Sequence, residues 1–146
     1  TRVRSSAASD VYKRQLSNLV AIHQKTGIGR LSAYCGAVSA GAAAGAGIAY
    51  LCGGGYEEVI HTVVNALAIV SGMVCDGAKA SCAAKIASSV DAGILGYNMY
   101  LRGQQFYAGD GIVTKGVEAT IQNIGRLGKD GMKETNEEII KMMISD

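Results

Sequence analysis

The stretch LSAYCGAVSAGAAAGAGIAYLC, residues 31–52, decides the fold because it includes no charged side chain. Alanine and glycine dominate it, and Gly41, Gly45 and Ala49 recur at intervals of four, a spacing typical of closely packed helices. The run is long enough for a membrane span, which needs about 20 apolar residues. However, alanine and glycine are weakly hydrophobic, and neither a Lys/Arg cluster nor an aromatic belt flanks the run. We therefore expect a buried central helix in a soluble domain, with a membrane helix as the alternative.

Further helices are expected on both sides of this run. Gly53, Gly54 and Gly55 end the central helix, because three successive glycines disfavour a helix interior. Glu57 and Glu58 open the next helix, where acidic side chains favour the positive end of the helix dipole. No strand pattern lasts for more than a few residues, so the predicted class is all-α, a compact Ala/Gly-rich helical domain. The additional helices are expected over residues 16–24, 57–74, 78–101, 113–127 and 134–144.

Composition and charge argue against a nucleic-acid-binding protein. The 146 residues are 49% hydrophobic and 18% charged, against a usual charged share of about 25%. The net charge of +2 comes from residues 1–15, which hold four basic side chains and one acidic one and so carry +3. Residues 16–146 hold the other 10 positive and 11 negative charges, a net of −1. A phosphate-binding surface needs clustered Lys and Arg on one face, so no nucleic-acid partner is expected.

The opening segment TRVRSSAASDVYKRQ, residues 1–15, resembles the translated read-through of a sequencing adapter. We therefore expect residues 1–15 to be a non-native tail and residues 16–146 to be the C-terminal part of a larger protein. The alternative is a transit peptide, because the segment is rich in Arg and Ser. A transit peptide would continue into an amphipathic helix, whereas LSNLVAIHQKTGIGR follows directly here.

The glycines and histidines form none of the common catalytic motifs. Residues 41–47 lack the GxGxxG spacing, and residues 72–79 lack the consecutive GK[ST] of a phosphate-binding loop. Close helix packing is the better explanation for these glycines. His23 and His61 are far apart in the sequence and belong to no metal-binding motif, so we expect satisfied core or surface residues.

Four cysteines occur, at positions 35, 52, 75 and 82. Without a signal peptide, we expect a cytoplasmic protein whose cysteines form no disulfides. The close Cys pairs of a tetrahedral zinc site are absent from the sequence. Two interpretations remain open: the cysteines are small buried hydrophobes, or three thiolates from separate segments bind an iron–sulfur cluster.

The residues around the last two cysteines carry a family resemblance. The segment GMVCDGAKASCAAKI, residues 72–86, with Cys35 forty residues before Cys75 and Cys82 seven after it, resembles the serine dehydratase alpha-chain superfamily. Its L-cysteine desulfidase-like branch is the nearest. The resemblance covers residue 16 to the C-terminus, about the last third of a full-length member. It implies that Cys35, Cys75 and Cys82 hold a [4Fe–4S] cluster.

The resemblance also implies a reaction. Three cysteine ligands leave one iron open as a Lewis acid, which activates the hydroxyl or thiol on Cβ of L-serine or L-cysteine. A base removes the α-proton, and β-elimination gives an aminoacrylate that hydrolyses to pyruvate and ammonia, with sulfide as a further product from cysteine. The base is expected in the missing N-terminal part, so this chain alone should be inactive.

Residues between the last two ligands are candidates for tuning the cluster. Asp76, Gly77 and Ser81 are placed to hydrogen-bond the cluster sulfurs through backbone NH groups or side chains. Lys79 and Lys85 either neutralise cluster charge, hold the substrate carboxylate or lie on a solvated helix face, and the last interpretation is favoured.

Cys52 has no place in the three-ligand pattern and is expected to be a packing residue at a helix end. Some serine dehydratases end in a cysteine tail that reaches the cluster, whereas this chain ends MISD, which favours the desulfidase-like branch.

The expected partner is a small amino-acid substrate. No membrane association is expected, and the sequence allows a homodimer. The alternative function is a non-catalytic helical packing or membrane module whose cysteines are core residues.

Overall fold

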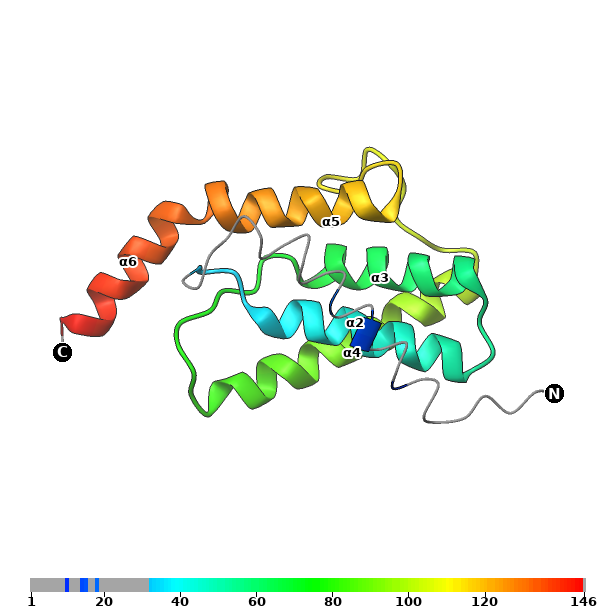
Figure 1. Cartoon of the computed structure of the whole chain (residues 1–146), viewed down its shortest axis with the longest axis horizontal. Helices are drawn as coiled ribbons and strands as arrows, with labels where there is room; N and C mark the ends of the chain where they lie inside the picture. Colours follow the sequence, from blue (N-terminus) through cyan, green and yellow to red (C-terminus); the bar gives the residue numbers. More distant parts are fainter. Residues whose placement is uncertain (1–9, 11–13, 16–17, 19–31, 146) are drawn as a thin grey trace.

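The computed structural model describes residues 10, 14, 15, 18 and 32–145. Helices α2, α3 and α4 lie side by side, α5 runs along α3, and α6 projects beyond the bundle (Figure 1). Within the described residues, the only β-type contact is an isolated antiparallel bridge between Tyr34 and Val74. The prediction of an all-α fold is therefore confirmed. The elements are α2 (Gly36–Leu51), α3 (Tyr56–Val70), α4 (Ser81–Leu101), α5 (Val117–Arg126), the π-helical turn η1 (Leu127–Gly131) and α6 (Lys133–Ile144).

Helix α2 is the buried central helix that the uncharged run predicts. It packs against both α3 and α4. Small side chains line most of its buried surface, so its neighbours approach the backbone closely. The buried residues of α2 are Val38, Ser39, Gly41, Ala42, Ala43, Gly45, Ala46, Gly47 and Ala49.

Glycines set the contact between α2 and α4, as the sequence predicts. A Cβ atom at Gly41 would overlap Cβ of Ser89, and one at Gly45 would lie 2.6 Å from Cα of Gly93. The two pairs have the same offset in sequence (89 − 41 = 93 − 45), so α2 and α4 run in the same direction. Helix α3 runs back in the opposite direction (Figure 1).

The end of α2 shows how the triple glycine works. Gly53 has a φ of 95°, a left-handed conformation that suits glycine. Its N–H donates to the carbonyl of Tyr50 at 3.1 Å, and the N–H of Gly54 donates to that of Ala49 at 2.9 Å, which satisfies two terminal carbonyls. Cys52 lies at this helix end but is exposed, so the prediction that it is a packing residue is wrong.

Several helix bounds differ from the predicted ranges. Helix α2 begins at Gly36 rather than 31, because residues 33–35 pair with residues 73–75 instead of joining the helix. The same pairing ends α3 at Val70 rather than 74. Helix α4 begins at Ser81 rather than 78, after a bend and a turn at residues 78–80. Helix α5 begins at Val117 instead of 113, and α6 begins one residue early. The helix expected over residues 16–24 lies outside the described residues, apart from residue 18.

One buried polar side chain connects α3 to the rest of the bundle. Asn65 is fully buried; its Nδ2 donates to the carbonyl of Gly96 at 3.0 Å, and its Oδ1 accepts the N–H of Phe106 at 3.1 Å. The bundle core around α3 is otherwise mainly apolar. Its largest fully buried apolar side chains are Leu67, Ile121, Ile124, Val38, Val59 and Val63.

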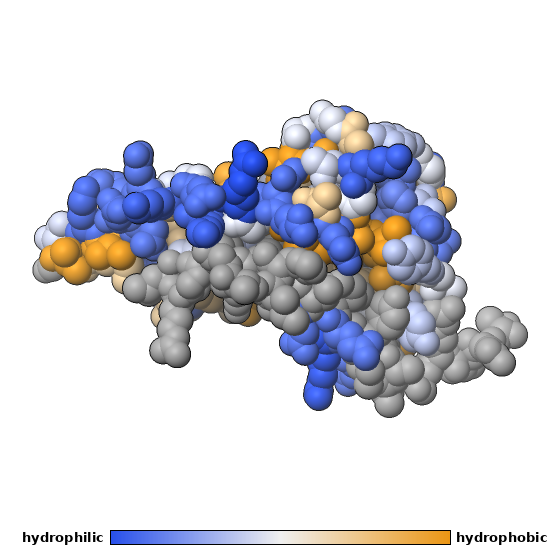
Figure 2. Space-filling model, turned by 45° about the horizontal axis from the view of Figure 1, so that its top comes forward, coloured by the Kyte–Doolittle hydropathy of each residue, from blue (hydrophilic) through white to orange (hydrophobic). Residues whose placement is uncertain are grey.

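The surface is divided between charged and apolar regions. Figure 2 shows hydrophilic residues over the outer side of α5 and α6 and an apolar patch near the tip of α6. The exposed apolar residues of α6 are Ile140, Met142, Met143 and Ile144. In the part of the chain that the structure describes, no helix is both long and apolar enough to cross a membrane.

Candidate metal centre

The backbone places Cys35 and Cys75 beside each other. The N–H of Cys35 donates to the carbonyl of Met73 at 3.2 Å, and that of Cys75 donates to the carbonyl of Ala33 at 2.6 Å. These two bonds flank the β-bridge, and successive side chains in such a pair point to opposite faces. Both cysteines therefore lie on the face opposite the bridge residues. They are diagonal neighbours, a relation that places residues about 7–8 Å apart.

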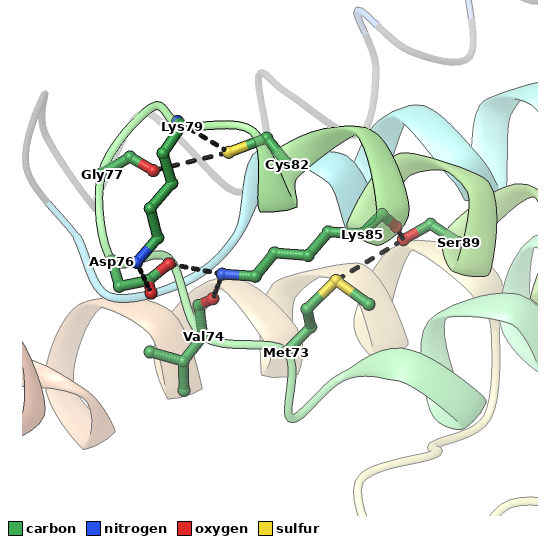
Figure 3. Close-up of polar contacts among 8 residues, drawn as sticks. All are labelled: Met73, Val74, Asp76, Gly77, Lys79, Cys82, Lys85 and Ser89. Carbon is green, nitrogen blue, oxygen red and sulfur yellow. Dashed lines mark hydrogen bonds and ion pairs between the residues drawn. The ribbon is translucent and has the colours of Figure 1, made fainter.

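Cys82 is brought toward the other two cysteines by α4, which packs along α2 and whose Lys85 bonds the carbonyl of Val74, next to Cys75. Cys82 lies in the first turn of α4. Its Sγ accepts the N–H of Lys79 at 3.4 Å and lies 3.4 Å from the carbonyl oxygen of Gly77, so the intervening loop folds over the sulfur (Figure 3).

The three thiols are the kind of donor that an iron–sulfur cluster uses. Cys35 is 5% exposed, Cys75 and Cys82 are half-buried, and none forms a disulfide. Among the described residues, no three His, Cys, Asp or Glu side chains are placed to hold one metal ion. The thiols come from three segments at one end of the bundle.

Lys85 connects these segments. Its Nζ donates to the carbonyl of Val74 at 2.8 Å and to Oδ1 of Asp76 at 2.5 Å, so its two acceptors flank Cys75 (Figure 3). The hydrogen bond to Asp76 raises the pKa of Lys85, and the sulfurs of Cys35 and Cys82 add a smaller electrostatic contribution. The side chain is 21% exposed. The prediction of a solvated helix face is therefore wrong for Lys85.

Asp76 joins both lysines of the site. Hydrogen bonds from Lys79 and then Lys85 hold the pKa of this carboxyl well below its ordinary value of 3.8, so it is ionised at neutral pH. Lys79 is 52% exposed and pairs with Oδ2, which agrees with a solvated position. An ionised carboxylate only accepts hydrogen bonds. Any contribution of Asp76 to hydrogen-bonding a cluster sulfur therefore falls to its backbone NH.

The other two predicted tuning residues are Gly77, on the same loop, and Ser81, where that loop joins α4. Gly77 has a φ of 97° and faces α6, because a Cβ there would lie 3.3 Å from Cε of Met143. Ser81 is exposed at the first residue of α4. Their role at a cluster stays a prediction.

A row of residues on α4 is the feature that sequence reasoning missed. Cys82, Lys85 and Ser89 stand at i, i+3 and i+7, a spacing that puts them on one face of a helix. Ser89 is fully buried; its Oγ donates to the carbonyl of Lys85 at 2.8 Å and lies 3.8 Å from Sδ of Met73. The signal was present in the spacing, but only the fold shows that this face meets residues 73–76.

His61 lies away from the cysteines. Its ring stacks on Tyr100 with centroids 4.8 Å apart, and its Nε2 lies 3.6 Å from Oε2 of Glu57. Its Nδ1 is buried without a hydrogen-bond partner among the described residues, so the expectation of a satisfied histidine fails at that nitrogen. The residue lines a cavity of about 320 Å³ beside residues 106–108 and 113–117. His23 lies outside the described residues.

The family model for the serine dehydratase alpha chain matches residues 11–141. The chain belongs to the serine dehydratase alpha-chain family. It is 69% identical over 130 residues to a UPF0597 protein of Desulfitobacterium hafniense, covering 89% of this chain and 30% of that protein. UPF0597 proteins of Lachnoclostridium phytofermentans and Treponema denticola are 58% and 55% identical, over 89% and 90% of this chain and 31% and 30% of those proteins.

The predicted family is thus confirmed, and the chain spans about 30% of the length of these curated relatives. The names of the relatives state no activity. No solved structure matches the chain. The division into a tail at residues 1–15 and a C-terminal part at residues 16–146 stays a prediction.

Proposed function

We propose that this chain is the cluster-binding part of an iron–sulfur lyase that eliminates the β-substituent of L-cysteine or L-serine. Cys35, Cys75 and Cys82 would be the protein ligands of a [4Fe–4S] cluster. The observation that carries the proposal is the meeting of three cysteine-bearing segments at one end of the bundle. Two of them pair through the backbone, and the helix that carries Cys82 is joined to them by Lys85, which bonds the carbonyl of Val74 beside Cys75.

The donor set agrees with this role. Thiolates are the ligands that iron–sulfur clusters use, and Cys35 is shielded from water while the other two are partly accessible. When bound, the cluster supplies an iron without a protein ligand, which acts as a Lewis acid toward the substrate's β-substituent. The residues of this chain position the thiolates, and Lys85 provides compensating positive charge.

With L-cysteine and one water, the overall products are pyruvate, ammonia and hydrogen sulfide; with L-serine they are pyruvate and ammonia. L-Cysteine is the preferred substrate in this proposal, because the chain resembles the desulfidase-like branch. The base that removes the α-proton is assigned to the part of the full-length protein outside this chain. We therefore expect this chain to bind the cluster without turning over either amino acid.

One observation favours the alternative of a packing module without catalysis. Cys35 belongs to the hydrophobic core, where a free cysteine serves as a small apolar side chain. Cys75 and Cys82 are only half-buried, so the alternative explains one cysteine of the three.

Anaerobic reconstitution with iron and sulfide tests the proposal. The parent chain should bind about four irons and four sulfides, whereas Cys35→Ala, Cys75→Ala and Cys82→Ala should lose most of both. Cys52→Ala is the matched control, because this exposed thiol lies at the opposite end of α2. A parent chain that is helical by circular dichroism but binds no iron would contradict the proposal.

A further inference from the structure

The three cysteine segments need three connections to keep their relative positions. Two backbone hydrogen bonds connect the Cys35 segment to the Cys75 segment. Packing at Gly41 and Ser89 connects α2, which follows Cys35, to α4, which carries Cys82. The third connection, from α4 to the Cys75 segment, is made chiefly by the long side chain of Lys85, with a 3.8 Å contact between Oγ of Ser89 and Sδ of Met73 beside it (Figure 3).

The surroundings of Lys85 make this connection more than a surface ion pair. An exposed ion pair contributes little, because water competes for both partners. Lys85 is 21% exposed and bonds a backbone carbonyl as well as a carboxylate. The backbone acceptor matters because the carbonyl of Val74 is joined directly to the nitrogen of Cys75. Lys79 makes a useful contrast, since it is 52% exposed and its ion pair reaches the same carboxylate.

We infer that Lys85 is a positioning residue, which holds the Cys75 segment against α4 before any cluster is bound and places a positive charge beside the thiolates. The charge is relevant because an iron–sulfur cluster held by three thiolates is anionic. This inference rests on the proposed function for its purpose. The positioning itself belongs to the metal-free chain and is measurable there.

Lys85→Met tests the inference, because methionine keeps an unbranched apolar side chain and removes the ammonium group. Lys79→Met is the matched control, since it removes the other lysine that pairs with Asp76. In the metal-free chain, Lys85→Met should speed hydrogen exchange at the Cys75 amide by about tenfold, the size expected when a charged hydrogen bond is lost. Lys79→Met should change this rate by less than about threefold.

The second measurement is the rate at which the reconstituted chain loses iron to a chelator under argon. Removing a residue that orients a metal ligand typically weakens a site by about 10–100-fold, so Lys85→Met should lose iron at least about tenfold faster than the parent. Lys85→Arg keeps the charge and the donors, and its exchange and iron-loss rates should stay within about threefold of the parent.

The outcomes separate this inference from the proposed function. A parent chain that binds no iron overturns the proposed function, while the exchange comparison still decides whether Lys85 positions the Cys75 segment. Equal exchange rates for Lys85→Met and the parent, or equal effects of Lys85→Met and Lys79→Met, overturn the inference. If Lys85→Met fails to fold, Lys85→Arg decides: a folded Arg variant with more than about tenfold faster exchange at Cys75 overturns it as well.

Discussion

Replacing Gly45 with alanine should weaken the contact between α2 and α4. The new Cβ would lie 2.6 Å from Cα of Gly93, and ordinary contact begins near 3.4 Å, so the helices must separate by about 0.8 Å. Overpacking costs about 1–3 kcal/mol, and the upper end applies because the obstructing atoms are backbone and cannot rotate away. The gain in helix propensity from glycine to alanine returns about 1 kcal/mol. The net loss in unfolding free energy is about 2 kcal/mol.

Thermal unfolding followed by circular dichroism measures this loss, which for a chain of this size corresponds to a fall in Tm of about 4–8 °C. Gly36→Ala is the matched control, because Gly36 is in the same helix and a Cβ there meets nothing within 4 Å. It should leave the unfolding free energy unchanged or raise it by up to about 1 kcal/mol. If Gly45→Ala is as stable as Gly36→Ala, the packing of α2 against α4 does not require a glycine at position 45.

Two further predictions concern buried polar groups. Asn65→Ala should lower the unfolding free energy by about 1–3 kcal/mol in urea titrations, because the N–H of Phe106 loses its acceptor. The control is Asn98→Ala, which removes an exposed hydrogen bond to a carbonyl of its own helix and should lower the unfolding free energy by less than about 0.5 kcal/mol. Burial raises the pKa of Tyr97 above its ordinary 10.0, so its neutral form favours the folded state. The contribution of Tyr97 to the unfolding free energy should therefore be fully present below pH 10 and should fall as the pH rises through its raised pKa. Tyr97→Phe should remove the part of the alkaline loss of stability that comes from this residue. An identical alkaline decline in Tyr97→Phe would count against the second prediction.

The number and order of the helices in residues 36–145 follow from local patterns, but their ends near the cysteines do not. The apolar run through residues 71–75 continues the pattern of α3, so it predicts helix. The structure instead pairs Met73 and Cys75 with residues 33–35. That pairing joins segments about forty residues apart, and a local pattern carries no information about it.

The candidate ligands came from cysteine spacing and a family resemblance, whereas for Lys85 the sequence favoured a solvated helix face over a role at the cluster. A lysine three residues after Cys82 on an expected helix is most often solvated. Its actual acceptors lie on a loop nine and eleven residues earlier, and only the path of residues 74–76 brings them within reach. The packing glycines were easier to predict, because the spacing of Gly41 and Gly45 alone indicates a close helix contact.

The opposite directions of α2 and α3 explain the forty-residue interval between Cys35 and Cys75. The two helices form an out-and-back hairpin of 16 and 15 residues, which at 1.5 Å per residue travel about 24 and 22 Å. The forty-residue interval is therefore made up of the two helices and the connecting segments at their ends. Adding one helical turn to α2 alone would move Cys75 away from Cys35, whereas adding one turn to both would restore the meeting. A change of about seven residues, one turn in each helix, therefore keeps both cysteines at the same end of the bundle.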